Sequence, residues 1–175
     1  MEVFIKWIGI FIMAFASVLL GVRKSMTFSA RLHNLYQLKR NFILIKGEIE
    51  YQQEPLIPIF KRLSCKCSGE YKKLFLQLGT ELEQKKGEEF SAIWRKIWNQ
   101  YKEPLFLQGE DMELIVSFGT SFSGADRKLQ MNTIQYFLIQ LDGQIEDARE
   151  QKKVGQKLYQ TLGVVGGFFL ILVLI

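Results

Sequence analysis

The sequence is poor in the residues that build disulfides, metal sites and histidine-dependent active sites. It holds two cysteines and one histidine among 175 residues. Cys65 and Cys67 are separated by one residue, which suits a disulfide poorly, and no second cysteine pair completes a zinc site. His33 lies far from both in the sequence. We therefore expect reduced thiols, no metal and no cofactor, as is typical of a cytoplasmic compartment.

The sequence also lacks the short motifs of common catalytic and nucleotide-binding sites. It contains no G-x-x-x-x-G-K-[ST] phosphate loop, no H-E-x-x-H and no G-x-S-x-G. Neighbouring carboxylates occur, but general acid–base catalysis needs two carboxylates held in different environments across a cleft. The pairs here are typical of solvated helix surfaces and first helical turns. We therefore predict a protein that is not an enzyme; the alternative is a membrane-tethered enzyme that uses carboxylates and a metal.

The chain carries a formal net charge of +5, yet its basic residues form no cluster interleaved with aromatic side chains. A nucleic-acid-binding surface is built from such a cluster, so we expect no nucleic-acid partner. The positive residues gather instead beside the two apolar ends of the chain, which indicates a membrane orientation.

The amino-terminal apolar segment, residues 3–22, predicts a transmembrane helix. No charged residue occurs from Trp7 to Val22, and Lys6 can extend its ammonium to the lipid headgroups, so the segment approaches the roughly 20 residues that cross a bilayer. The alternative is a cleaved signal peptide, since Ala14-Phe15-Ala16 is a small-residue cleavage pattern. The weakly basic amino terminus and the continuing apolar run favour the retained helix.

The carboxyl-terminal segment, residues 158–175, predicts a second transmembrane helix. It contains no charge, and at 1.5 Å per residue it covers roughly 27 Å, about the thickness of a bilayer core. Gly163 and Gly167 form a G-x-x-x-G pattern, which lets another helix pack closely. The alternative is that glycine is simply frequent in membrane helices.

Basic residues on the inner flanks of these two segments predict the orientation of the chain. Because Lys and Arg stay on the cytoplasmic side, we expect residues 25–157 to form a cytoplasmic domain with both termini across the membrane, in contact with the lipid bilayer. The flanking residues are Arg23, Lys24, Arg31, Lys152, Lys153 and Lys157.

The segment between the apolar ends predicts an all-α bundle of about six helices, because its apolar residues recur every three or four positions. A long first helix continues from the first apolar segment. A short second helix starts near Pro55, and a turn covers Ser64–Gly69. The third helix is predicted to end at Lys85-Lys86-Gly87.

The second half of this segment predicts three more helices. One runs from about Glu88 to Tyr101 and the next covers Glu110–Phe118, followed by a turn over Gly119–Gly124. The last begins near Ala125 or Asp126 and meets no breaker before the second apolar segment. We predict that the aromatic residues on these helices are core, the alternative being an aromatic ligand pocket. The stripe expected to be buried on the last helix is Leu129, Ile134, Phe137, Leu138, Leu141 and Ile145.

Four local patterns, in their order and spacing, resemble the stage III sporulation protein AB family. They are Glu48-Ile49-Glu50-Tyr51 with Pro55-Leu56, Phe90 to Trp94, Gly119 to Gln130 with Gly124 and Asp126, and Lys157-Leu158-Tyr159 running into Leu162–Gly167. The resemblance covers nearly the whole chain. Ala125 departs from the family, where serine is expected before the aspartate, and this weakens the predicted helix cap because serine is the better N-cap.

The resemblance implies a component of a transenvelope channel that joins mother cell and forespore during endospore formation, in the mother-cell membrane. Its domain would be similar to the platform protein of type II secretion and type IV pilus machines. By that analogy it would dock a cytoplasmic hexameric ATPase, stage III sporulation protein AA, contact other membrane components and form an oligomer. The alternative is a two-span helical adaptor of another envelope system.

An acidic region between the third and fourth predicted helices is the expected partner surface. Docking of a cytoplasmic protein should use exposed charged residues, and carboxylates are concentrated in this region. The expected contact residues are Glu81, Glu83, Glu88 and Glu89.

Overall fold

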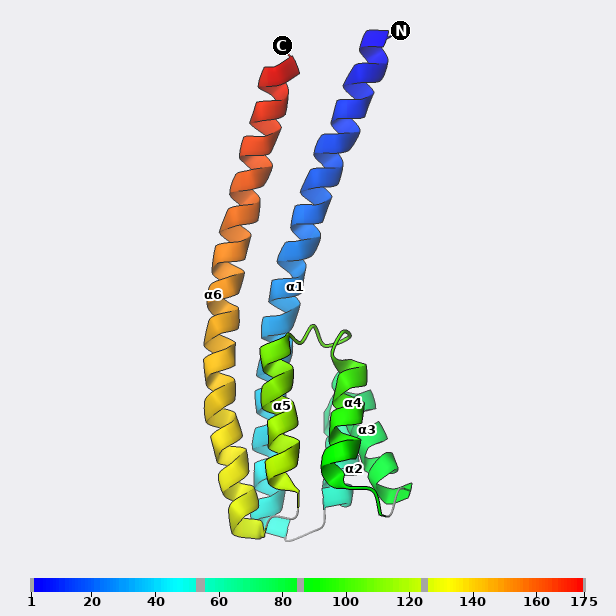
Figure 1. Cartoon of the computed structure of the whole chain (residues 1–175), viewed down its shortest axis with the longest axis vertical. Helices are drawn as coiled ribbons and strands as arrows, with labels where there is room; N and C mark the ends of the chain where they lie inside the picture. The colour runs from blue at the N-terminus through cyan, green and yellow to red at the C-terminus, as the bar shows by residue number, and fades with distance from the viewer. Residues whose placement is uncertain (1, 53–55, 85–86, 124–125, 175) are drawn as a thin grey trace. The chain divides into compact units, whose positions relative to one another are not determined.

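The computed structural model describes the backbone of residues 2–52, 56–84, 87–123 and 126–174. It describes the side chains of residues 26–51, 57–84, 87–123, 126–155, 157, 158 and 161. The predicted all-α fold with about six helices is confirmed (Figure 1). The helices are α1 (Glu2–Gln52), α2 (Leu56–Lys66), α3 (Gly69–Gln84), α4 (Phe90–Tyr101), α5 (Gly109–Phe122) and α6 (Arg127–Leu174).

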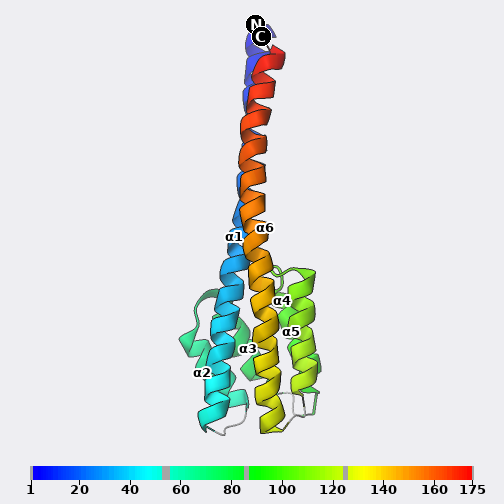
Figure 2. The same cartoon turned by 90° about the vertical axis from the view of Figure 1, so that its left-hand side faces the viewer.

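The chain divides into two compact units. One contains Met1–Leu32 with Asp147–Ile175, and the other contains His33–Glu146. In the second unit α2 packs on α3, α3 on α4 and α4 on α5. Within this unit, Figure 1 shows α6 on one side of α1 and α5 and shows α2, α3 and α4 on the other side, and Figure 2 shows α6 in front of α1 and α5.

An aromatic cluster forms the centre of the His33–Glu146 unit, as the helical stripes predict. Phe42 of α1 stacks on Phe137 of α6, with ring centroids 4.1 Å apart, and meets Phe118 of α5 edge-on at 4.9 Å. Trp94 of α4 packs on Phe118 at 5.3 Å. All four side chains are buried, so α1, α4, α5 and α6 share one close-packed core.

Buried hydrogen bonds fix α3 and the α4–α5 connection to α1. The side-chain amide of Asn34 donates to the Leu105 carbonyl over 2.8 Å, and the Tyr71 hydroxyl donates to the Asn34 carbonyl over 2.8 Å. Burial raises the pKa of Tyr71 well above its ordinary value, so the hydroxyl remains protonated and remains a donor. These two polar groups therefore hold neighbouring elements together, since both donors have a partner.

Two predicted boundaries in the first half of the bundle are wrong by a few residues. The predicted turn over Ser64–Gly69 is shorter, because α2 continues to Lys66. Ser64 is buried, and its hydroxyl donates to the Lys61 carbonyl over 2.7 Å. Because this hydrogen bond satisfies the hydroxyl within the helix, serine can lie in the last turns of α2. The fourth helix begins at Phe90 rather than Glu88.

The predicted end of the fifth helix at Phe118 is also wrong, because α5 continues through Gly119 to Phe122. A Cβ built on Gly119 would lie 2.3 Å from Cδ1 of Trp94. The indole occupies the space that a side chain would need, and its Nε1–H donates to the Ile115 carbonyl over 2.7 Å. Gly119 therefore serves close packing between α4 and α5 rather than a turn.

The last helix begins with an aspartate cap, one of the two candidates (Asp126 and Gly124) that the sequence offers, and it has one misplaced core residue. Asp126 accepts a hydrogen bond from the Leu129 backbone N–H over 2.8 Å, so its carboxylate caps α6 although Ala125 replaces the expected serine. Leu129, predicted to be buried, is 52% exposed, whereas the remaining five residues of that stripe are buried.

The Met1–Leu32 and Asp147–Ile175 unit pairs the amino-terminal part of α1 with the carboxyl-terminal part of α6. Gly155 lies against Phe28, since a Cβ on this glycine would be 2.9 Å from Cε2 of the ring. Among the described residues, no helix is long and apolar enough to cross a membrane. The side chains of the predicted span 3–22 lie outside the described residues, as do those of 158–175 apart from Leu158 and Thr161.

Candidate partner-binding surface

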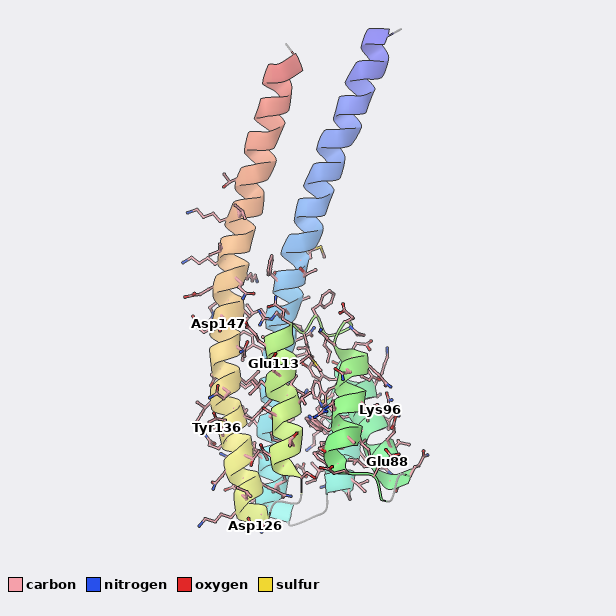
Figure 3. All side chains as sticks on the ribbon, viewed as in Figure 1. Glu88, Lys96, Glu113, Asp126, Tyr136 and Asp147 are labelled. Atoms are coloured by element: carbon pink, nitrogen blue, oxygen red, sulfur yellow. The ribbon has the colours of Figure 1, made fainter. Side chains whose placement is uncertain are left out.

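The four acidic residues predicted to bind a partner lie at the end of α3 and just before α4. Figure 3 labels Glu88, which precedes α4, and Lys96, which lies on α4. Glu88 and Glu89 are both exposed. Glu89 is the N-cap residue of α4, but its side chain makes no capping hydrogen bond.

Lysines neutralise the other two acidic residues of the predicted surface. Nζ of Lys96 forms an ion pair with Oε2 of Glu81 at 3.0 Å, and Nζ of Lys61 forms one with Oε2 of Glu83 at 2.6 Å. The side chain of Glu81 is only 17% exposed, whereas that of Glu83 is 55% exposed. The surface is therefore a mixed-charge region in which Glu83, Glu88 and Glu89 are exposed.

The basic residues that predict the membrane orientation have different surroundings in the structure. Arg31 is 2% exposed and donates from Nη1 to Oε1 of Gln151 over 2.8 Å, within the unit that both residues belong to. Lys152 is half-buried, and Lys153 and Lys157 are exposed. The side chains of the other two basic residues, Arg23 and Lys24, lie outside the described residues. The surroundings of the predicted packing glycines, Gly163 and Gly167, are not described either.

Two of the residues considered for metal binding, Cys67 and His33, lie beside other polar groups, and Cys65 is an exposed free thiol. The Cys67 thiol donates to Oδ1 of Asn41 over 3.2 Å, and burial raises the pKa of this thiol. A ring nitrogen of His33 lies 2.7 Å from Nε2 of Gln37. In the part of the chain with described side chains, no group of three or more His, Cys, Asp and Glu could hold a metal ion.

A surface cavity between α5 and α6, which the sequence did not suggest, has a volume of about 270 Å³. Its floor is apolar, with Leu114, Phe118 and Phe137, and it is also lined by Tyr136 of α6, a residue that is 64% exposed (Figure 3). The rim is polar: Ser117, Ser121, Asn132 and Thr133. Helical periodicity marks the floor as core, but it cannot show that two neighbouring helices leave a hollow between them.

Glu48 joins α1 to α2 through two cations. Its Oε2 accepts from Arg62 Nη2 over 3.1 Å, and its Oε1 accepts from Lys66 over 2.8 Å. The hydrogen bond from Lys66, together with the nearby guanidinium of Arg62, lowers the pKa of the Glu48 carboxyl, although partial burial opposes this. The cluster therefore stabilises the fold only while Glu48 is ionised.

We predict that acidification removes the contribution of Glu48. A lowered pKa in the folded state means that the stabilisation is complete above the unfolded value, near 4.5, and is lost as the pH falls through the folded value. Glu48→Gln should lower the free energy of unfolding at pH 7 by no more than about 1 kcal/mol, because solvent screens the partly exposed cations. The difference from wild type should shrink between about pH 5 and pH 3.

Urea unfolding at several pH values measures this effect. Lys66→Gln serves as a matched variant, because it removes the hydrogen bond that contributes most to the lowered pKa of Glu48 and should flatten the pH dependence in the same direction. A Glu48→Gln difference that stays constant down to pH 3 would contradict the assignment.

Known proteins of one family match this chain over nearly its whole length. The profile described as stage III sporulation protein AB matches residues 6–175. Stage III sporulation protein AB of Bacillus subtilis (strain 168) is 22% identical over 170 residues, covering 97% of this chain and 99% of that protein. A solved structure of a stage III sporulation protein AB has a TM-score of 0.65 and 20% identity, covering 71% of this chain and 98% of its own, which shows the shared fold.

The resemblance drawn from the four local patterns is thereby confirmed, since the matched region contains all of them and the buried and capping residues described above. The family description names a sporulation protein and no reaction. This chain belongs to the stage III sporulation protein AB family.

Proposed function

We propose that this chain is a non-enzymatic platform that holds a cytoplasmic ATPase at the mother-cell membrane during endospore formation. The observation that carries the proposal is the match of residues 6–175 to a family of sporulation proteins. A compact helical unit, His33–Glu146, is consistent with it, because the buried polar groups described there are used to fix one helix to another.

Apolar segments at both ends of the chain support a membrane location. Residues 3–22 and 158–175 would each cross the bilayer, and the basic residues beside them would keep the bundle in the cytoplasm with both termini on the opposite side. Such an arrangement ties the bundle to the bilayer at two points. A motor bound to it could then transmit force to the channel.

The proposed partner is a hexameric ATPase of the same system, stage III sporulation protein AA. This part of the proposal rests on the likeness to platform proteins of secretion and pilus machines. The aromatic core suits such a role, because interiors at crystal-like density transmit displacement rather than absorb it.

We predict that charge reversal at Glu88 and Glu89 weakens ATPase binding. Both carboxylates are exposed, and a cationic partner surface would meet repulsion where it had met attraction. The double variant Glu88→Lys/Glu89→Lys should bind the ATPase about tenfold more weakly, equivalent to ~1.4 kcal/mol, with a reduced dependence on salt. Titration of the full chain in detergent, followed by fluorescence anisotropy of the labelled ATPase, measures the change.

The matched control is Glu110→Lys/Glu113→Lys on α5, which makes the same change of charge at exposed residues of another helix. This variant should retain nearly the wild-type affinity. Equal losses in both variants would indicate a general effect of net charge, and full binding by the first variant would remove this surface from the proposal.

A further inference from the structure

Basic residues beside the two apolar segments have no acidic residues near them in the sequence. Asp and Glu are absent between Glu2 and Glu48 and again after Glu150. Arg31 is buried against Gln151 and Lys152 is half-buried, so neither presents its charge fully to solvent. We call the remaining four basic residues of these flanks the basic belt: Arg23, Lys24, Lys153 and Lys157.

Contacts between α1 and α6 in the Met1–Leu32 and Asp147–Ile175 unit bring the belt to one level along the helices. Arg31 binds Gln151, and Gly155 lies against Phe28. Four residues forward along α6 therefore match three residues backward along α1, so the two helices run antiparallel with residue 28 level with residue 155. This register places Lys24 level with residue 159, within about one turn of Lys157.

The two lysines of the belt on α6 are exposed. They lie four residues apart and therefore on one side of the helix, whereas Ala148 and Gly155 of α6 are buried on the other side. Within the part of the chain whose side chains are described, neither Lys153 nor Lys157 has an ion-pair partner. Two neighbouring ammonium groups are thus available to an anionic ligand.

Exposed apolar side chains lie at the same level as these cations. Met26 and Leu158 are 65% and 54% exposed, and the register places residue 26 level with Lys157. A soluble anion would use the ammonium groups and leave both apolar side chains in water. A phospholipid offers a phosphate to the lysines and acyl chains to the apolar residues, so the combination favours a lipid.

We propose that the basic belt binds anionic phospholipids of the cytoplasmic leaflet. The lipid phosphates contact Lys153 and Lys157, and the adjoining acyl chains cover Met26 and Leu158. This inference rests on the membrane location proposed above and goes beyond it. Orientation requires only that basic residues remain on one side of the bilayer, whereas the belt distinguishes one class of lipid from another.

Quenching of tryptophan fluorescence by brominated lipids measures this distinction in bilayers. The full chain with Trp7→Phe and Thr161→Trp carries a reporter one helical turn beyond Lys157. Trp94 and Trp98 are fully buried in the bundle, so brominated lipid does not reach them. The vesicles contain phosphatidylcholine and phosphatidylglycerol, and the bromine is placed on one lipid or the other. Phosphatidylglycerol should be preferred about tenfold at low salt, and high salt should reduce this preference several-fold.

Variants at the two exposed lysines test the belt itself. Lys153→Gln/Lys157→Gln should lower the preference at least about fivefold, because each basic residue near an anionic lipid surface contributes about that factor. Lys153→Arg/Lys157→Arg should retain it, since the charge is kept. The matched control, Lys72→Gln/Lys128→Gln, removes the same charge from exposed lysines of the His33–Glu146 unit and should leave the preference within about twofold of wild type.

Three results would overturn the proposal. Equal quenching by both lipids in the wild-type chain would show that the belt does not distinguish them. An equal loss in the control variant would assign the preference to net charge rather than to the belt. Loss of the preference on addition of excess glycerol 3-phosphate would make a soluble phosphate the occupant in place of the lipid.

Flotation with vesicles of phosphatidylcholine alone separates this inference from the membrane location. Insertion of the full chain into these neutral vesicles, without a lipid preference in the quenching assay, overturns the lipid site and leaves the membrane location intact. A chain that does not float with them contradicts the membrane location and, with it, the lipid site.

Discussion

Replacement of Gly119 with alanine is expected to lower the free energy of unfolding by about 1–3 kcal/mol. A Cβ at this position would lie 2.3 Å from Cδ1 and 2.7 Å from Cγ of Trp94, far inside the contact distance of carbon atoms. The indole is fully buried and is held by its hydrogen bond to the Ile115 carbonyl. Either it shifts and loses that bond, or α5 moves away from α4.

The competing effect is the higher helix propensity of alanine, worth about 1 kcal/mol in a helix interior. Overpacking in a dense core costs about 1–3 kcal/mol, and the strained hydrogen bond adds about 1 kcal/mol. Together these costs exceed the gain in helix propensity, so the net effect is a lower free energy of unfolding. Gly47→Ala in α1 is the matched control, because nothing lies within 4 Å of its added Cβ. Urea unfolding of a segment of about residues 25–152 should show the control unchanged or slightly stabilised; stabilisation of both variants would contradict the packing assigned to Gly119.

The second large effect is expected at Phe42, where replacement with alanine should lower the free energy of unfolding by about 3–5 kcal/mol. This ring contacts Phe137, Phe118 and Trp94 at centroid distances of 4.1, 4.9 and 6.3 Å. Its removal would leave a cavity between helices that are far apart in the sequence, and rigid aromatic neighbours cannot collapse into it fully.

Ile43→Ala is the control for this substitution, because the neighbouring residue on α1 is 50% exposed. It should cost less than about 1 kcal/mol, since much of the Ile43 side chain is already in water. The same unfolding assay measures both variants. A small loss at Phe42, equal to that at Ile43, would show that the four aromatic rings do not form the centre of the fold.

Helical periodicity predicted most of this fold because it depends only on spacing along one chain. The apolar stripe expected on the first long helix is Phe28, Leu32, Leu35, Leu38, Phe42, Ile45 and Ile49. The last five of these are buried, Phe28 and Leu32 are half-buried, and α1 passes through all of them without a break. Prolines and the capping aspartate placed helix boundaries to within a few residues, since their effects are local.

Features that depend on a second helix could not be predicted in this way. Gly119 appears in the sequence as a helix breaker, and only the position of Trp94 shows that it is an interior contact. Leu129 fits the buried period by sequence spacing, but it is 52% exposed in the structure. Which face of a helix is covered is decided by tertiary packing.

The candidate surface was predicted in part. The sequence located carboxylates around the α3–α4 connection, but it could not show that Lys96 and Lys61 lie beside Glu81 and Glu83. These ion pairs join residues 15 and 22 positions apart, beyond the range of a helical repeat. The exposed members of the predicted surface are Glu83, Glu88 and Glu89.

Binding of the sporulation ATPase from the same organism tests the proposed platform function most directly. The assay would use the segment of about residues 25–152 and, in parallel, the full chain in detergent. We predict saturable binding that persists at moderate salt and weakens in Glu88→Lys/Glu89→Lys. Absence of binding by both the segment and the full chain would contradict the platform function and leave a family member with a helical bundle and another partner.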